Sequence, residues 1–382
     1  MIISEEVKSN ILNYINGKHA YKDRGIEKLF MDTYKVEALP EILEENIRPL
    51  WVGLKVTPKC NMKCEHCWAE LKGKEKDFEY IKKAIDKLSE LQILHLTISG
   101  GEPFLRKDLY EIVKYAKSKR MCLEIFSNGS LIDEEICSKL SSIYNKNIDA
   151  IQISLDASER ESYYKQRGND GFDKVIKSIK MLKEYNFIVR VNFTVTHLNQ
   201  MEIFEAFKLC NTLGVDTFSI SHVYDLNKGQ NLYEKVDFLT YINEINKCIN
   251  YAGKFKTELK PFIPVEFFSY VSEKKEFSEV IIEDKTSLLT WFINSSGDIY
   301  PDVTLELNEF YIGNIYNDDL EDIYMNIKKI AKKMTKRDLR SSKCSYCNNV
   351  NICKGGDLGR TYKRYSNFNQ ADPRCSFKYK VR

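Results

Sequence analysis

The chain has 382 residues, 43% of them hydrophobic, so it is long enough for two or three domains with an ordinary buried core. Its 58 Lys and Arg residues nearly balance 55 Asp and Glu residues, and a net charge of +3 creates no long-range field that requires a nucleic acid or membrane partner. The start at Met1 lacks a signal-peptide pattern, and no window approaches about eighteen unbroken apolar residues. These features predict a cytoplasmic globular enzyme that binds neither nucleic acid nor membrane.

Short helical pieces are predicted before Trp51, and we interpret residues 1–50 as an N-terminal helical extension. From Val52 onward, β-branched runs alternate with amphipathic segments, which is the pattern of βα units around a parallel sheet. The predicted strands are Val52–Thr57, Ile93–Ser99, Met121–Ser127, Ala150–Leu155, Ile188–Thr196 and Thr217–Ser221. Predicted helices between them include Tyr80–Leu91, Leu109–Lys119, Phe172–Tyr185 and Met201–Leu213.

These units predict an α/β fold with a partial (β/α)6 TIM-type barrel over residues 51–250. The βα rhythm fails beyond about Asn250, so we interpret residues 251–290 as a bridging region and residues 291–382 as a small C-terminal α+β domain. Catalytic groups in such barrels follow the C-terminal ends of the strands. The loops after the first four predicted strands accordingly carry the most informative residues, which are Cys60 to Cys67, Gly100 to Pro103, Asn128-Gly129 and Asp156.

Seven of the eleven cysteines fall into two groups, and reducing conditions favour metal ligation over disulfides for clustered thiols. The first group, Cys60, Cys64 and Cys67, has the spacing C-x3-C-x2-C directly after a strand. Three thiolates from one loop can bind three irons of a cubane cluster and leave the fourth iron open. A zinc site with His66 as its fourth ligand is the alternative.

This loop, with His66 in the aromatic position before its last cysteine, resembles the cysteine motif of the radical S-adenosylmethionine (SAM) superfamily. The resemblance implies a [4Fe–4S] cluster whose open iron binds SAM, and whose electron splits SAM to give a 5′-deoxyadenosyl radical. The same family has a GGEP element that shapes a loop around the SAM amino group. Its match in this chain is Gly100, Gly101, Glu102 and Pro103.

Several other positions match the family pattern less tightly. The resemblance implies that Ser127 and Asn128 contact the SAM ribose and that Arg167 pairs with the SAM carboxylate. The remaining predicted SAM contacts are His66, Ser154, Asp156 and Asn192. An Asn-Gly turn, a helix cap and a solvated arginine are the alternatives, and the sequence assigns no catalytic acid or base.

The second cysteine group comprises Cys344, Cys347, Cys353 and Cys375. Four thiolates can complete either a second cubane or a zinc knuckle. This region resembles the SPASM domain of radical SAM enzymes that modify peptides, which implies an auxiliary [4Fe–4S] cluster and makes residues 291–382 an iron–sulfur domain. Asp302 and Asp357 stand where that domain has cysteines, so its second, inner cluster is expected to be absent. We interpret both aspartates as solvated, with an acid–base role as the alternative.

The resemblance implies an enzyme that abstracts hydrogen from a ribosomally synthesised peptide to install a thioether, a carbon–carbon crosslink or an epimer. The implied partners are the precursor peptide, a flavodoxin- or ferredoxin-type electron donor and, as an option, a separate leader-peptide recognition protein. One alternative is radical modification of a small molecule such as a haem-type or redox cofactor precursor. Another is a non-catalytic iron–sulfur electron carrier, which the intact Gly100 to Pro103 element disfavours.

Overall fold

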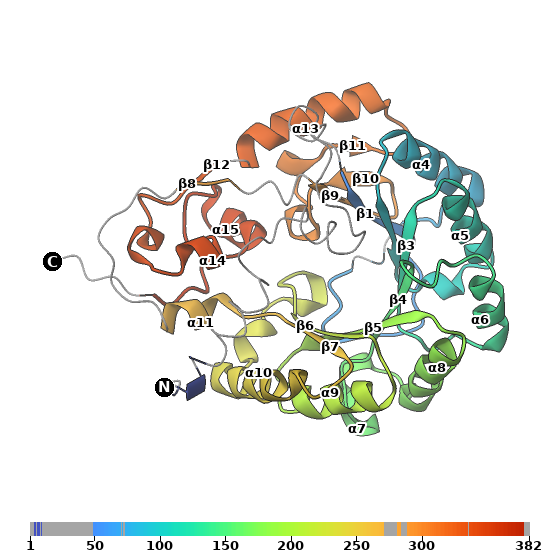
Figure 1. Ribbon diagram of the computed structural model, residues 1–382. Coiled ribbons are helices and arrows are strands. Elements are labelled where there is room, and N and C mark those ends of the chain that lie inside the picture. Colours follow the sequence, from blue (N-terminus) through green and yellow to red (C-terminus); the bar gives the residue numbers. More distant parts are fainter. Residues whose placement is uncertain are drawn as a thin grey trace.

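The computed structural model describes residues 4, 6, 7, 9, 49–69, 71, 73–270, 281–283, 289–334 and 336–377, so the predicted N-terminal extension lies almost wholly outside the described residues. Its central feature is a ten-stranded sheet with the strand order β11-β10-β9-β1-β2-β3-β4-β5-β6-β7. The sheet curves, and helices α4 to α10 cover its outer face (Figure 1).

The strands β1 to β7 run parallel, each paired with the next in the chain. Their bounds are β1 Trp51–Thr57, β2 His95–Gly100, β3 Cys122–Ser127, β4 Ala150–Ser154, β5 Ile188–Val195, β6 Thr217–His222 and β7 Glu258–Pro261. The predicted strands match β1 to β6 within about two residues. Strand β7 is an addition, because it lies in the segment that we interpreted as a bridging region.

The helices that connect these strands are amphipathic, with one buried face each. Their bounds are α4 Phe78–Glu90, α5 Leu109–Ser118, α6 Glu134–Ser141, α7 Arg160–Arg167, α8 Phe172–Glu184, α9 Ile203–Thr212 and α10 Phe238–Ala252. In α4, Asp77 caps the first turn by accepting a hydrogen bond from the Tyr80 amide, and Ile81, Ala84 and Ile85 are buried at helical spacing. None of the described helices is long and apolar enough to cross a membrane.

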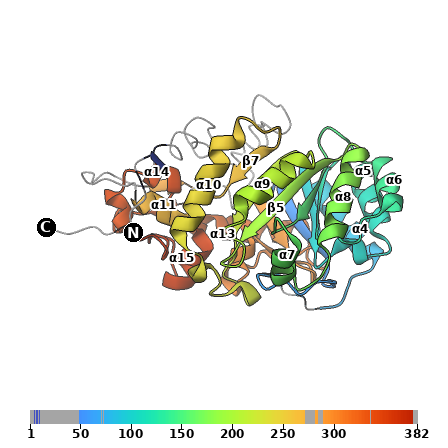
Figure 2. The same ribbon diagram turned by 90° about the horizontal axis from the view of Figure 1, so that it is seen from below.

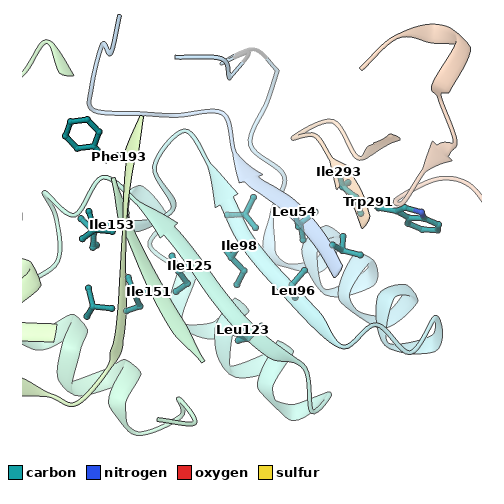
Figure 3. Close-up of a cluster of buried hydrophobic side chains, with 14 of the residues drawn as sticks. Leu54, Leu96, Ile98, Leu123, Ile125, Ile151, Ile153, Phe193, Trp291 and Ile293 are labelled. Carbon is teal, nitrogen blue, oxygen red and sulfur yellow. The ribbon is translucent and has the colours of Figure 1, made fainter. Parts of the chain in front are cut away.

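The core lies between the sheet and these helices. Strand β5 alternates half-buried and fully buried residues, so Val191 and Phe193 face the core while Asn192 faces the concave side. Figure 3 shows the same core continuing across neighbouring strands, with Ile153 of β4 and Ile125 of β3 among its members. The concave face of the sheet is therefore left for polar side chains and a site.

The C-terminal part adds a hairpin to the sheet and a small helical region beside it. Strand β9 pairs in parallel with β1, and β10 and β11 continue the sheet in antiparallel pairing. The bounds are α11 Val265–Tyr270, β8 Ile281–Glu283, β9 Thr290–Ile293, β10 Asp298–Tyr300, β11 Gly313–Asn314, α13 Leu320–Met334, β12 Lys336–Asp338, α14 Val350–Cys353 and α15 Leu358–Tyr365. A separate ladder joins β8 to β12. Helices α14 and α15 lie at the opposite end of the molecule from α5 and α6 (Figure 2).

Among the described residues the sheet ends at β7 on one side and at β11 on the other, and it does not close on itself. The prediction of an α/β fold with a partial barrel is therefore confirmed. Parallel strands also direct their C-terminal ends to one edge of the sheet, which is where the cysteine loop after β1 lies.

Candidate active site

The first cysteine group lies in the loop between β1 and α4. Cys64 is buried, whereas Cys60 and Cys67 are half-buried. Burial raises the pKa of Cys60 to about 11 and also raises the pKa of Cys67. To bind a metal as thiolates, these cysteines must lose their protons, and burial opposes that loss. Nearby positive charges would favour deprotonation.

The glycine pair after β2 allows the next loop to pack directly on the start of the cysteine loop. A Cβ at Gly101 would overlap the carbonyl oxygen of Lys59, and a Cβ at Gly100 would crowd that of Thr57. The amides of Gly101 and Glu102 donate hydrogen bonds of 2.8 and 2.7 Å to the carbonyls of Thr57 and Lys59. Glycine is needed here for close approach of two backbones.

The Glu102 carboxylate connects this loop with the loop after β3. It accepts hydrogen bonds from the Ser127 hydroxyl at 2.9 Å and from the Asn128 amide at 2.7 Å. The Asn128 side chain donates in turn to Asn61 at 2.8 Å, inside the cysteine loop. Burial raises the pKa of Glu102, although these donors act in the opposite direction. The loops after β1, β2 and β3 thus form one hydrogen-bonded unit, and the buried Pro103 begins a 3-10 turn beside it.

Asp156, after β4, is a fully buried carboxylate with a left-handed backbone at φ 57°. Its Oδ2 atom lies 2.6 Å from Arg167 Nη2 and 3.1 Å from His66 Nε2. Burial alone would raise the pKa of Asp156, but Arg167 and His66 overcome it and hold the pKa below its usual value. These contacts bring together three of the predicted site residues, from the loop after β4, the end of α7 and the cysteine loop.

Arg167 also connects this pair to the cysteines. Its Nη1 atom lies 3.5 Å from Cys64 Sγ, and its buried Nε has no hydrogen-bond partner among the described residues. The end of α7 is bound to the cysteine loop because the Glu65 amide donates to the Gln166 carbonyl at 3.1 Å. The ion pair is thus with Asp156, and the predicted contact of Arg167 with the SAM carboxylate stays a prediction.

Ser154 and Asn192 are neighbours on the concave face, paired in register between β4 and β5. The Asn192 side chain donates to the Thr194 hydroxyl at 3.1 Å. Both residues are half-buried, so they are accessible from the concave side. Their contact with SAM stays a prediction.

The loop after β6 was missed by the sequence analysis, although it covers the cysteine loop. Asn227 donates from its side chain to the Trp68 carbonyl at 2.5 Å, and a Cβ at Gly229 would lie 3.3 Å from the His66 carbonyl oxygen. The Trp68 ring packs edge-on against Tyr224 and against Phe292 of β9. Only the Asn-Lys-Gly turn signal at residues 227–229 could have indicated this loop.

Lys55 is a second residue that sequence reasoning missed. It is 3% exposed, and its ammonium lies 4.6 Å from the Trp68 ring centroid and 4.9 Å from that of Phe292. It also lowers the pKa of the Cys67 thiol, against the larger effect of burial. The available signal was a lysine inside an otherwise apolar strand.

The donor set fits a cubane cluster better than a zinc ion. Across the ranges that the structure describes, no three His, Cys, Asp or Glu side chains converge as ligands of one metal ion. A zinc ion requires such convergence, whereas each cysteine of a cubane binds a different iron. The cations Arg167 and Lys55 beside the thiols also suit an anionic cluster.

The comparison with known families agrees with this geometry. Residues 54–210 match the family model described as the Radical SAM superfamily. Residues 54–210 are a radical SAM domain. This segment includes the cysteine loop, the glycine pair, Asp156 and Arg167, and the family uses SAM and a [4Fe–4S] cluster. The resemblance inferred from the sequence motifs is confirmed.

The names of curated relatives of this chain refer to two different products, heme and a bacteriocin. An AdoMet-dependent heme synthase of Methanosarcina barkeri is 23% identical over 347 residues, covering 86% of this chain and 97% of its own length. The antilisterial bacteriocin subtilosin biosynthesis protein AlbA of Bacillus subtilis is 29% identical over 280 residues, covering 72% of this chain and 59% of its own length.

A solved structure shares the fold. The crystal structure of Streptococcus suis SuiB bound to precursor peptide SuiA superimposes with a TM-score of 0.69 and 20% identity, covering 87% of this chain and 78% of that chain. The likeness therefore extends well beyond residues 54–210 of the radical SAM domain.

The second cysteine group converges on one cavity at the far end of the molecule. Cys344, Cys347, Cys353 and Cys375 all line it, together with apolar residues that include Phe268 of α11. Burial raises the pKa of Cys344 to about 11 and raises the pKa values of Cys353 and Cys375. Two buried and two half-buried thiols around one apolar cavity could supply the donor set of a closed cubane.

Asp302 and Asp357 are helix caps, and the interpretation that they are merely solvated was wrong. Asp302 accepts hydrogen bonds from the Thr304 amide and hydroxyl, at 2.8 and 2.6 Å. Asp357 accepts one from the Arg360 amide at 2.6 Å at the start of α15. Both are half-buried, and burial raises the pKa of Asp302. Their carboxylates therefore stabilise two short helices at the positions where the SPASM resemblance has cysteines.

Proposed function

We propose that this radical SAM enzyme abstracts hydrogen from a ribosomally synthesised peptide and so installs a crosslink or an epimer. The observation that carries this proposal is the open barrel, whose sheet ends at β7. An extended peptide can reach the concave face from that side without threading a closed ring. The name of AlbA and the peptide in the SuiB structure support the same substrate class.

The residues of the site would have different roles. Cys60, Cys64 and Cys67 would hold the [4Fe–4S] cluster, and bound SAM would supply the 5′-deoxyadenosyl radical. Glu102 positions the loops after β2 and β3, and Asp156 fixes Arg167 beside Cys64. The remaining predicted SAM contacts are Gly100, Gly101, Pro103, Ser127, Asn128, Ser154, Asn192 and His66.

The loop after β6 would protect a reactive radical from water. Its hydrogen bond to Trp68 and its close packing on His66 place it over the cysteine loop. Excluding solvent from such a site prevents side reactions. A flavodoxin- or ferredoxin-type protein would supply the electron.

We further propose that Cys344, Cys347, Cys353 and Cys375 hold an auxiliary [4Fe–4S] cluster. Support comes from the shared cavity and from its burial beneath α11. The buried Arg337 guanidinium stabilises the neighbouring backbone by donating to the carbonyls of Lys354 and Gly356, at 2.7 and 3.0 Å. A cluster held by four thiolates has no open iron for substrate, so its role would be electron transfer.

A second candidate function is radical modification of a haem-type precursor. The observation that favours it is the match to the Methanosarcina barkeri heme synthase over 97% of that protein's length. The buried His95 and Glu124 and the half-buried Arg190 also lie on β2, β3 and β5, with Arg190 Nη1 3.0 Å from Glu124 Oε1. Arg190 is partly exposed, so it could pair with a propionate of such a substrate.

A competition between substrate classes tests the proposal. Anaerobically reconstituted enzyme is incubated with SAM and reductant, either with short peptides encoded beside its gene or with iron coproporphyrin. Substrate-dependent 5′-deoxyadenosine is measured by chromatography and the mass change of each substrate by mass spectrometry. We expect a mass change of a peptide, with deuterium from a labelled residue recovered in 5′-deoxyadenosine.

The control is Cys64→Ala, which removes one predicted cluster ligand and should abolish both readouts. A mass change of the porphyrin alone would overturn the peptide proposal in favour of the second candidate. Formation of 5′-deoxyadenosine that neither substrate class increases would contradict both proposals.

A further inference from the structure

A chain of aromatic rings runs from the cysteine loop toward the second cysteine group. The Trp68 and Tyr224 ring centroids are 6.0 Å apart, those of Tyr224 and His222 are 5.4 Å apart, and those of His222 and Tyr233 are 5.9 Å apart. Each pair meets edge to face, so the rings are in van der Waals contact.

Both ends of this chain adjoin predicted cluster ligands. Trp68 directly follows Cys67 in the sequence. At the other end, the Arg374 guanidinium carbon lies 3.5 Å from the Tyr233 ring centroid, and Arg374 directly precedes Cys375. The path therefore begins at Trp68 and ends at Arg374, and each of these two residues is adjacent in sequence to a cysteine.

The surroundings keep the rings neutral and fixed. Burial raises the pKa values of the Tyr224 and Tyr233 phenols, and the Tyr233 hydroxyl donates to Glu266 at 3.1 Å. His222 is buried, and burial together with Arg360 and Arg374 lowers its pKa well below the usual value. At neutral pH the three groups therefore stay uncharged, and an electron can pass without a proton moving.

The path also crosses the region where the second, inner cluster of a full SPASM domain is expected to be absent. The carboxylates of Asp302 and Asp357, which replace its cysteines, act electrostatically on Tyr224. Helix α15, which Asp357 caps, contacts His222 through Arg360, whose Nη1 lies 3.1 Å from the imidazole Nε2. The rings thus lie between the two cysteine groups, where no cluster ligand is predicted.

We propose that Trp68, Tyr224, His222 and Tyr233 form an electron-transfer relay between the two cysteine sites. The relay rests on the proposed auxiliary cluster at Cys344, Cys347, Cys353 and Cys375. One electron leaves the reduced auxiliary site and arrives at the site of Cys60, Cys64 and Cys67, so one cluster is oxidised and the other reduced by one electron. No bond forms or breaks in the relay, and a reduced flavodoxin- or ferredoxin-type protein replaces the electron.

The test follows electron passage directly. Fully reduced, desalted enzyme is mixed rapidly with SAM, and freeze-quench EPR follows the decay of the auxiliary signal as the first site is reoxidised. We expect Tyr224→Leu and Tyr233→Leu to slow this decay by about tenfold or more. Tyr224→Phe and Tyr233→Phe, which keep the rings, should retain the wild-type rate.

Iron content, SAM affinity and the midpoint potentials of both clusters are measured first for every variant. Tyr251→Leu, a half-exposed tyrosine on α10 away from the path, is the matched control. Two clusters with unchanged decay in both leucine variants would overturn the relay alone. About four irons per chain in the wild type instead of about eight would overturn the auxiliary cluster and the relay with it.

Discussion

The buried carboxylate of Asp156 contributes to the stability of the fold as well as to the electrostatics of the site. Removing one partner of a buried ion pair leaves the other charge uncompensated and costs about 3–5 kcal/mol. We expect Asp156→Asn to lower the free energy of unfolding by about that amount, because Asn tolerates the left-handed backbone but cannot balance Arg167. Denaturant unfolding of the reconstituted protein measures this loss.

The matched control is Asp173→Asn, which breaks an exposed ion pair with Arg160 at 2.9 Å. Exposed pairs contribute about 0–1 kcal/mol, so this variant should be nearly neutral. Equal losses in the two variants would contradict the role of burial at Asp156.

The same carboxylate sets a dependence on pH. Its pKa is below the usual aspartate value of about 3.9, so its contribution is fully present above that value and is lost as pH falls through the folded-state pKa. We expect the stability difference between wild type and Asp156→Asn to be constant around neutral pH and to shrink only in strong acid. Unfolding curves across acidic pH measure this, and a difference that already shrinks around neutral pH would contradict the assignment to Asp156.

Lys55 supplies positive charge beside the predicted cluster. A nearby cation favours the more negative, reduced form of a cluster, so we expect Lys55→Met to lower the midpoint potential of the first site. An EPR-monitored redox titration measures the shift. Lys59→Met removes a lysine whose side chain is 64% exposed, and it should leave the potential nearly unchanged because solvent screens that charge.

At the scale of elements, the close packing of two loops depends on Gly101. A Cβ there would overlap the Lys59 carbonyl and move the loop that carries Cys60. We therefore expect Gly101→Ala to bind less iron at the first site, which colorimetric iron analysis and EPR can measure. Gly253→Ala is the control, since a Cβ there meets nothing within 4 Å and the backbone has φ −74°. Normal iron content in Gly101→Ala would show that the loops can separate without loss of the site.

The strands and helices of the barrel could be predicted because their periodicity is local. The predicted strand Ile188–Thr196 and the predicted helix Met201–Leu213, for example, match β5 and α9 within about two residues. The pairing of Asp156 with Arg167 and His66 could not be predicted, because it depends on the loop after β4, the end of α7 and the cysteine loop meeting in space. The same holds for Lys55, whose aromatic neighbours come from the cysteine loop and from β9, more than 200 residues away.

The short strand β7 could not be predicted from the sequence either. Glu258–Pro261 is four residues long and contains both charges and a proline, so its sequence has little strand character. It forms because β6 offers a free edge with which it pairs in register. A strand at the edge of a sheet can carry such residues because one of its sides needs no partner.

At the scale of the whole molecule, Arg337 stabilises the C-terminal part around the second cysteine group. Its 1% exposed guanidinium donates to backbone carbonyls of Phe368, Gly355 and Gln370 as well as those of Lys354 and Gly356. We expect Arg337→Met to leave these carbonyls unsatisfied and to reduce iron content by about four per chain while the first site stays loaded. Arg340→Met, at an exposed pair with Asp338, is the control.

The parallel pairing of β9 with β1 also determines which fragments of the chain keep both neighbours of the first barrel strand. Trp51 to Leu54 hydrogen-bond with Thr290 to Ile293, so one side of the first barrel strand is completed by residues almost 240 positions later. A fragment that ends before β9 would expose that side of β1 as an unpaired edge, next to the loop that carries Cys60, Cys64 and Cys67. The segment that defines the family therefore lacks one neighbour of its first strand when it stands alone. During synthesis, the cysteine loop acquires its final support only after the C-terminal hairpin has been made.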